Sequence, residues 1–158
     1  MIEFGHLSHV GLRRDLNEDT YYGDSELGLW LVADGMGGHE YGEVASALAR
    51  DAIVREVRAG ASLANAIRRA DEDILRTSRR RNDALPMGTT VVAARVTGAR
   101  FEVAWVGDSR VYLWRDGKLA QLSQDHSYVQ ELIAGGAITH EQARTHPQRN
   151  VVTQALGV

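Results

Sequence analysis

The chain has 158 residues and a formal net charge of −3, and 25% of its residues are charged. This length fits one domain with a buried core, and the weak net charge gives no reason to expect nucleic-acid binding. No cysteine is present, which excludes disulfides, thiolate metal ligands and cysteine-nucleophile enzymes. Any metal is then bound through oxygen or imidazole, which favours Mg²⁺ or Mn²⁺ over structural zinc. With no long apolar run and no signal-peptide core, we expect a cytoplasmic protein without membrane contact.

The first half of the chain predicts short strands followed by two long helices. Residues 4–12 and 20–24 are predicted as strands around a polar loop, and residues 29–33 as a buried strand. Apolar residues then recur at helical spacing over residues 42–57. A second helix is expected over residues 62–78, with the serine at its start as the N-cap.

The second half changes to strands rich in Val, Thr and aromatic residues, joined by tight turns. The expected strands are residues 89–96, 101–106, 111–114 and 119–122, with a hairpin turn over 115–118. Further helices are predicted at residues 128–134 and after Thr139, where a capping box is present. Because the two long helices fall between groups of strands, the expected class is α+β, in one domain that spans residues 1–158.

Acidic or Gly-Thr segments occur at four expected strand ends. They are Asn17-Glu18-Asp19, Asp34-Gly35, Gly88-Thr89-Thr90 and Gly107-Asp108-Ser109-Arg110. Carboxylates that converge repel one another unless cations neutralise them, so two hard cations that share an aspartate would suit such a cluster. An arginine beside it can bind a phosphate with two hydrogen bonds, and Arg14 is the best candidate by position.

Each of these residues also has a plain structural interpretation when taken alone. Glu18 and Asp19 fit solvated loop carboxylates, Asp108 fits a turn cap, and Arg14 fits a surface cation. The histidines fit structural hydrogen-bonding roles better than ligand or acid roles, and those weighed are His39, His126 and His146. No Gly-x-Ser-x-Gly segment marks a serine nucleophile.

Taken together and in order, the motifs resemble the PPM family, the type 2C metal-dependent protein Ser/Thr phosphatases in their bacterial form. The matching segments are Val10-Gly11, Arg14-x-x-Asn17-Glu18-Asp19, Asp34-Gly35-Met36-Gly37-Gly38-His39, Met87-Gly88-Thr89-Thr90, Gly107-Asp108-Ser109-Arg110, Gln124-Asp125-His126-Ser127, Gly136-Ala137-Ile138, His146-Pro147 and residues 150–157. The order of the motifs over nearly the whole chain is far more specific than any one of them.

The resemblance implies a β-sandwich of two antiparallel sheets flanked by helices, with two metal ions in a cleft. It also implies hydrolysis of phosphoserine and phosphothreonine in proteins by a metal-activated water, opposing a Ser/Thr kinase. Arg14 would hold the substrate phosphate. Residues 127–149 resemble the flap beside the cleft.

The resemblance also implies the ligands of Mg²⁺ or Mn²⁺. Asp34 would bridge two ions, and the Gly35 carbonyl and Glu18 would serve the second of them. Asp19 would orient metal-bound water from outside the ligand set, and Asp108 would contribute to a third, weaker ion.

Two departures from the family pattern stand out. Met36 takes the place of a histidine proposed as general acid in animal members, as is common in bacterial ones. The chain also stops at Val158, before the family's C-terminal strands and the two further aspartates of the first metal, so we expect a domain that lacks this part. The main alternative is therefore a catalytically deficient module that binds a phosphoprotein or other partner. A structural Mg²⁺-binding domain explains the acidic segments but not Arg14, and the absence of an Asp-x-Asp motif disfavours a haloacid-dehalogenase-type phosphatase.

Overall fold

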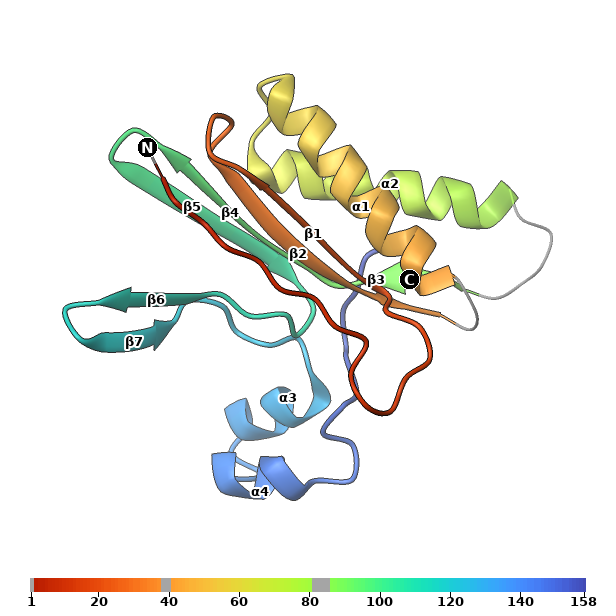
Figure 1. Ribbon diagram of the computed structural model, residues 1–158. Coiled ribbons are helices and arrows are strands. Elements are labelled where there is room, and N and C mark those ends of the chain that lie inside the picture. Colours follow the sequence, from red (N-terminus) through yellow and green to blue (C-terminus); the bar gives the residue numbers. More distant parts are fainter. Residues whose placement is uncertain (1, 38–40, 81–85) are drawn as a thin grey trace.

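Antiparallel strands and helices build the computed structural model, which describes residues 2–37, 41–80 and 86–158 (Figure 1). The elements, in chain order, are β1 (Asp19–Asp24), β2 (Leu29–Met36), α1 (Tyr41–Arg58), α2 (Leu63–Arg80), β3 (Gly88–Thr89), β4 (Val91–Thr97), β5 (Arg100–Val106), β6 (Tyr112–Arg115), β7 (Lys118–Gln121), α3 (Tyr128–Ala134) and α4 (His140–Thr145). The predicted α+β class is confirmed. The expected strand over residues 89–96 is divided at Thr90 into β3 and β4.

The larger sheet has the strand order β1-β2-β4-β5, and β3 pairs with the end of β2. All of these pairs are antiparallel. In β2, Leu29, Leu31 and Ala33 are buried, whereas the alternate residues Val32 and Asp34 are exposed. Because side chains alternate across a strand, Asp34 projects from the face opposite the buried leucines.

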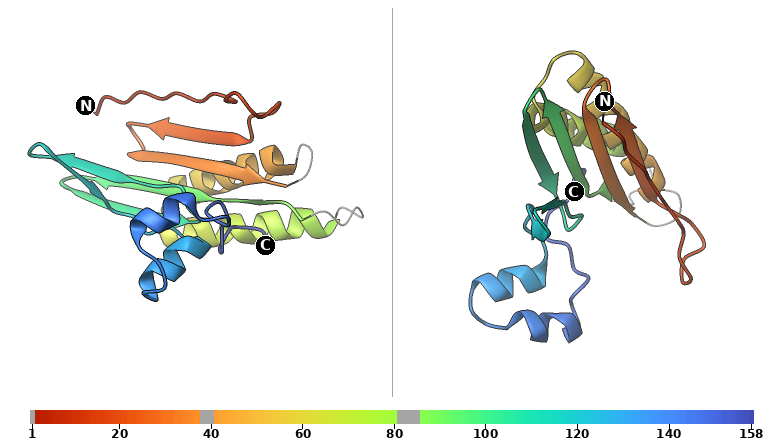
Figure 2. Two further views of the ribbon diagram at one scale, coloured as in Figure 1. Left: turned by 90° about the horizontal axis from the view of Figure 1, so that it is seen from below. Right: turned by 60° about the vertical axis from the view of Figure 1, so that its left-hand side comes forward.

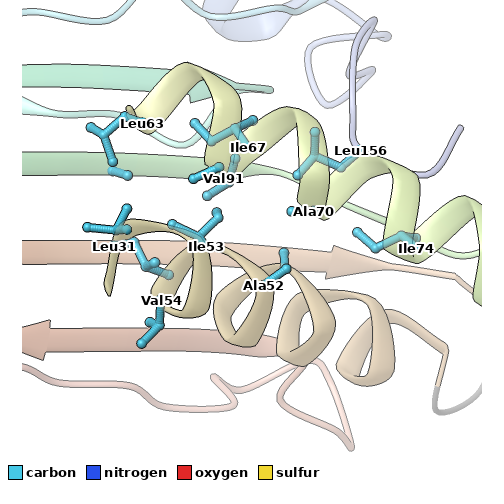
Figure 3. Packing of buried hydrophobic residues seen from close by; sticks show 14 of the residues in the cluster. Leu31, Ala52, Ile53, Val54, Leu63, Ile67, Ala70, Ile74, Val91 and Leu156 are labelled. Carbon is cyan, nitrogen blue, oxygen red and sulfur yellow. The ribbon is translucent and has the colours of Figure 1, made fainter. Parts of the chain in front are cut away.

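Helices α1 and α2 cover the leucine face of the sheet and form the core with it (Figure 2). Figure 3 shows Ile53 of α1 and Ile67 of α2 directed toward Leu31 and Val91 of the sheet. Alanines occupy many of the other buried helix positions and permit close approach of the helices, namely Ala45, Ala49, Ala52, Ala66 and Ala70. Ser62 caps the start of α2 as expected, since the Asn65 N–H donates to its Oγ at 3.3 Å.

The expected strand over residues 4–12 is wrong. This segment has no strand assignment, and it packs by its side chains on the outer face of the sheet. The Phe4 ring lies edge-on to Trp30 with centroids 6.1 Å apart, and His6 stacks on Tyr21 at 4.1 Å. A segment that crosses a sheet face cannot join the backbone ladder at the sheet edge, so aromatic residues here signal face packing.

The β6–β7 hairpin and the short helices α3 and α4 lie away from the helix-covered sheet (Figures 1 and 2). The hairpin turn is as predicted, and Asp116 and Gly117 adopt positive φ angles of 51° and 73°. The predicted capping box of α4 is also confirmed, since Thr139 and Gln142 exchange side chain to backbone hydrogen bonds. Within the described residues, none of the helices combines the length and apolar character that crossing a bilayer requires.

Candidate metal centre

Two carboxylates face each other across the β1–β2 ladder. Asp19 is the direct partner of Asp34 in the antiparallel register. Residues paired in this way lie on the same face of a sheet, and like charges placed directly opposite are destabilising. The sheet therefore holds two acidic groups together at its outer face, at the end where β2 leads toward α1.

A third carboxylate, that of Asp108 on the loop after β5, influences the pKa of Asp34. Although the residue is exposed, partial desolvation of its carboxylate raises the pKa of Asp34 from 3.8 to about 6, with further contributions from the negative charges of Asp19 and Asp108 and from a side-chain hydrogen bond with Asp19. The positive charge of Arg14 acts in the opposite direction. The charges of Asp19 and Asp108 therefore both act on Asp34.

Glu18 and Gly35 meet at the first turn of α1. The Gly35 N–H donates to the Glu18 carbonyl at 3.1 Å, and the Ser46 hydroxyl donates to the same carbonyl at 2.8 Å. A Cβ atom on Gly42 would overlap the Glu18 carboxylate and lie 2.8 Å from the Gly35 carbonyl carbon. Gly42 therefore leaves room for the Glu18 carboxylate beside the Gly35 peptide, and its absent side chain is part of the site.

Arg14 is close to Glu18 but not fixed by it. Its Nη1 atom lies 3.8 Å from Glu18 Oε2, and its side chain is 76% exposed, whereas that of Glu18 is 15% exposed. An ion pair of this length at an exposed position holds the guanidinium weakly. Arg14 is thus a cation beside the carboxylates that remains free to bind an anion.

Thr90 connects the strand that carries Asp34 to the loop that carries Asp108. Its hydroxyl accepts a hydrogen bond from the Asp34 N–H at 3.1 Å and lies 2.7 Å from Ser109 Oγ. The Thr90 N–H in turn donates to the Asp34 carbonyl at 2.9 Å. The sequence indicated Thr90 only as part of a Gly-Thr segment at a strand end, whereas the structure shows that its side chain links two acidic segments.

His126 fixes the other side of the Asp108 loop. The Gly107 N–H donates to His126 Nδ1 at 3.0 Å, and the His126 N–H donates to the Gly107 carbonyl at 2.9 Å. His146 accepts a hydrogen bond from the Gln148 N–H through its own Nδ1. Both histidines thus make hydrogen bonds of the kind that a structural role requires, and His39 lies outside the described residues.

The donor groups suit a hard divalent cation, because all are oxygen atoms and their negative charges oppose one another. Within residues 2–37, 41–80 and 86–158, however, no three His, Asp or Glu side chains form a ready-made metal site. The donors lie in two neighbouring groups: Asp34 with Asp19 and Asp108, and Glu18 with the Gly35 peptide. Sequence reasoning missed Gly42 and Ser46, whose only signal is a pair of small residues in the first turns of a helix.

Comparison with known proteins places the chain in a family. The family described as "Protein phosphatase 2C" matches residues 6–132. The serine/threonine protein phosphatase PstP of Mycobacterium tuberculosis is 39% identical over 162 residues, which cover 99% of this chain and 31% of PstP. The serine/threonine phosphatase stp of Listeria monocytogenes is 39% identical over 169 residues, which cover 95% of this chain and 67% of that protein.

Solved structures agree with the sequence relatives. The crystal structure of the M. tuberculosis phosphatase PstP/Ppp superposes with a TM-score of 0.88 at 39% identity, covering 96% of this chain and 66% of that one. A structure of the PstP catalytic domain in complex with two manganese ions superposes with a TM-score of 0.83 at 36% identity. This chain therefore spans about a third of full-length PstP and about two thirds of the solved domains. From the match over most of its length, the chain belongs to the protein phosphatase 2C family.

Proposed function

We propose that this protein is a metal-dependent protein phosphatase that hydrolyses phosphoserine and phosphothreonine in protein substrates and opposes a Ser/Thr kinase. The observation that carries the proposal is the pairing of Asp19 with Asp34 across the β1–β2 ladder, with the charges of Asp108 and Arg14 acting on Asp34. The family relatives support the reaction class, since their names describe serine/threonine phosphatases.

In the proposed site, Asp34 would serve both of two Mg²⁺ or Mn²⁺ ions. Glu18 and the Gly35 carbonyl would add donors for one of them, and Asp108 would help to hold a third, weaker ion. Ions of this kind supply Lewis-acid activation of the attacking water and neutralise phosphate charge. Asp19 lies opposite Asp34 in the ladder and shares a side-chain hydrogen bond with it. From this position Asp19 would orient metal-bound water.

Arg14 binds the substrate in this proposal. Its guanidinium carries donors in a planar fork that matches two oxygens of a phosphate, and its exposure leaves it free to reach them. Its charge also stabilises the ionised form of Asp34. One side chain thus draws a phosphorylated residue to the carboxylates and favours the charged state of Asp34.

Residues 1–158 belong to a single domain in this proposal, and that domain has the two-sheet sandwich of the family. In the 158-residue chain, the outer face of the larger sheet carries Val32, which is 47% exposed, and Tyr21, which is 39% exposed. Residues 2–10 cover only part of this face. We propose that a second sheet packs here, and that the C-terminal part of the relatives supplies both this cover and further metal ligands.

The test compares two polypeptides for phosphate release from phosphothreonine peptides with Mn²⁺ and with EDTA. One is the 158-residue chain, and the other is this chain extended with the C-terminal part of the PstP catalytic domain. We expect Mn²⁺-dependent release from the extended chain, little from the shorter one, and none from either after Asp34→Asn. If the extended chain is folded and binds the peptide but releases no phosphate, the protein is a phosphoprotein-binding module and the proposed function is wrong.

A further inference from the structure

A pocket that does not include Asp19 or Asp34 lies between the base of the β6–β7 hairpin and helices α3 and α4. Its volume is about 720 Å³. Val129, Ile133 and Ala143 form an apolar part of its wall, and polar and charged side chains form the rest. A pocket of this size accommodates several residues of a peptide as well as a small anion.

One arginine of the pocket is already paired. The Arg110 guanidinium forms a two-pronged pair with Asp125, with Nε to Oδ1 at 2.9 Å and Nη2 to Oδ2 at 2.6 Å. This pair holds Arg110 ionised, and its pKa lies above the ordinary value chiefly because of the hydrogen bond to Asp125. Arg110 therefore shapes the wall but contributes little free positive charge.

Two other arginines of the pocket have no acidic partner within the described residues. Arg144 lies on α4 and Arg149 follows it, and both are exposed. The Arg149 guanidinium approaches the His146 carbonyl at 3.5 Å, which leaves its charge uncompensated. His140 and Asn150 also line the wall near these arginines, and the acidic residues of the lining are Asp108 and the already paired Asp125. Unpaired guanidinium groups beside a pocket favour a dianionic ligand such as a phosphate.

The pocket and the carboxylate cluster share Asp108. This residue lines the pocket, and its charge reaches Asp34. The carboxylate site and the pocket thus adjoin at Asp108. An extended peptide advances about 3.3 Å per residue, so a neighbouring residue of the same substrate is the natural occupant.

We propose that this pocket binds a second phosphoryl group of the protein substrate, carried on a residue that flanks the one to be hydrolysed. The inference rests on the proposed phosphatase function and narrows its substrates to multiply phosphorylated segments. Arg144 and Arg149 are the positioning residues for this second group. They do not touch the phosphate that is hydrolysed, so their effect falls on affinity and not on the chemical step.

The test measures peptide binding in EDTA, where hydrolysis cannot confuse the result. Fluorescence anisotropy compares a singly phosphorylated peptide with peptides that carry a second phosphothreonine at successive positions on either side. We expect one spacing to bind about tenfold more tightly than the single phosphate, as charge-assisted pairs to two guanidinium groups provide. The Arg144→Gln, Arg149→Gln double variant should remove this difference, whereas Arg100→Gln, at an exposed position on β5, should retain it. Inorganic phosphate added to the singly phosphorylated peptide separates capture of free phosphate from capture of a substrate group.

Equal affinity for singly and doubly phosphorylated peptides would overturn the inference, and so would a preference that survives in the double variant. A pocket filled equally well by free phosphate would also overturn it, because the second group would then gain nothing from attachment to the substrate. These outcomes differ from failure of the proposed function. That failure appears as absent Mn²⁺-dependent phosphate release and leaves the binding result in EDTA untouched.

Discussion

Replacement of Asp34 by asparagine separates the role of this carboxylate in metal binding from its effect on stability. In the absence of cations, desolvation of the Asp34 carboxylate disfavours its ionised form in the folded state, and the charges of Asp19, which lies opposite, and of Asp108 add to this effect. Asparagine has nearly the same shape and no charge. We therefore expect Asp34→Asn to stabilise the metal-free protein near neutral pH while it weakens metal binding.

The magnitude follows from the pKa of Asp34, which rises from 3.8 to about 6 in the folded state. The full shift corresponds to about 3 kcal/mol, and exposure of this residue to solvent reduces the expected effect to about 1–2 kcal/mol. The folded state binds the Asp34 proton more tightly than the unfolded state, so ionisation of Asp34 lowers the free energy of unfolding. This loss of stability is absent below pH 3.8, grows as the pH rises toward 6, and is complete above pH 6.

Thermal unfolding in EDTA, measured from about pH 4 to 8, tests this expectation. The melting temperature of Asp34→Asn should exceed that of the parent by roughly 3–8 °C at neutral pH and converge with it at low pH. With Mn²⁺ the order should reverse, because only the parent gains stability from the ion. Glu26→Gln removes an exposed carboxylate at the far end of β1 and β2 and should show neither effect. If Asp34→Asn is less stable than the parent in EDTA at neutral pH, the carboxylate is a structural partner and the repulsion argument is wrong.

Three further substitutions test other parts of the site. Arg14→Ala should raise KM for a phosphopeptide by about tenfold or more in the extended chain. The melting temperature should change little, because the ion pair of Arg14 with Glu18 is exposed. A large loss of stability with unchanged KM would contradict this role. Gly42→Ala should lower the free energy of unfolding by about 1–3 kcal/mol and weaken Mn²⁺ binding measured by calorimetry, because the added methyl group overlaps the Glu18 carboxylate. Alanine normally favours a helix over glycine, so a gain in melting temperature would show that the Glu18 side chain moves aside without cost. Thr90→Val keeps the shape but leaves the Asp34 N–H without its side-chain acceptor, so unfolding in urea should show a loss of about 1–3 kcal/mol; no loss would mean that the link carries no energy.

Much of the fold could be predicted because its elements carry strong local patterns. Helix α1 and the strand β2 follow the periods of their apolar residues, and the caps at Ser62 and Thr139 need only nearby atoms. The prediction fails over residues 4–12, where aromatic residues suggest a strand but pack on a sheet face. Whether such a segment joins an edge or crosses a face depends on the position of distant strands, which no local pattern contains.

The candidate site shows the same division between local and distant information. The acidic residues were evident from their places after or before apolar runs, and in the structure the charges of Asp19 and Asp108 act on Asp34. The register that sets Asp19 opposite Asp34 could not be read from either segment alone, because a shift by one residue would turn one side chain to the other face. Gly42 likewise acquires its role only when α1 packs against Glu18.

The site coincides with a place where the sheet departs from what stability alone favours. Leu29 and Leu31 in β2 pack against the helices, and a β-branched pair opposite one another would suit the outer face of β1 and β2 as well. Asp19 and Asp34 occupy that pair instead, and the backbone of Asp34 is held on its other side by buried Thr90. A rigid strand that forces two carboxylates together gains little unless a cation enters between them or beside them. The unfavourable charge of the metal-free protein and the affinity expected for Mg²⁺ or Mn²⁺ therefore have one origin, which is why a single isosteric change at Asp34 should improve the first property and remove the second.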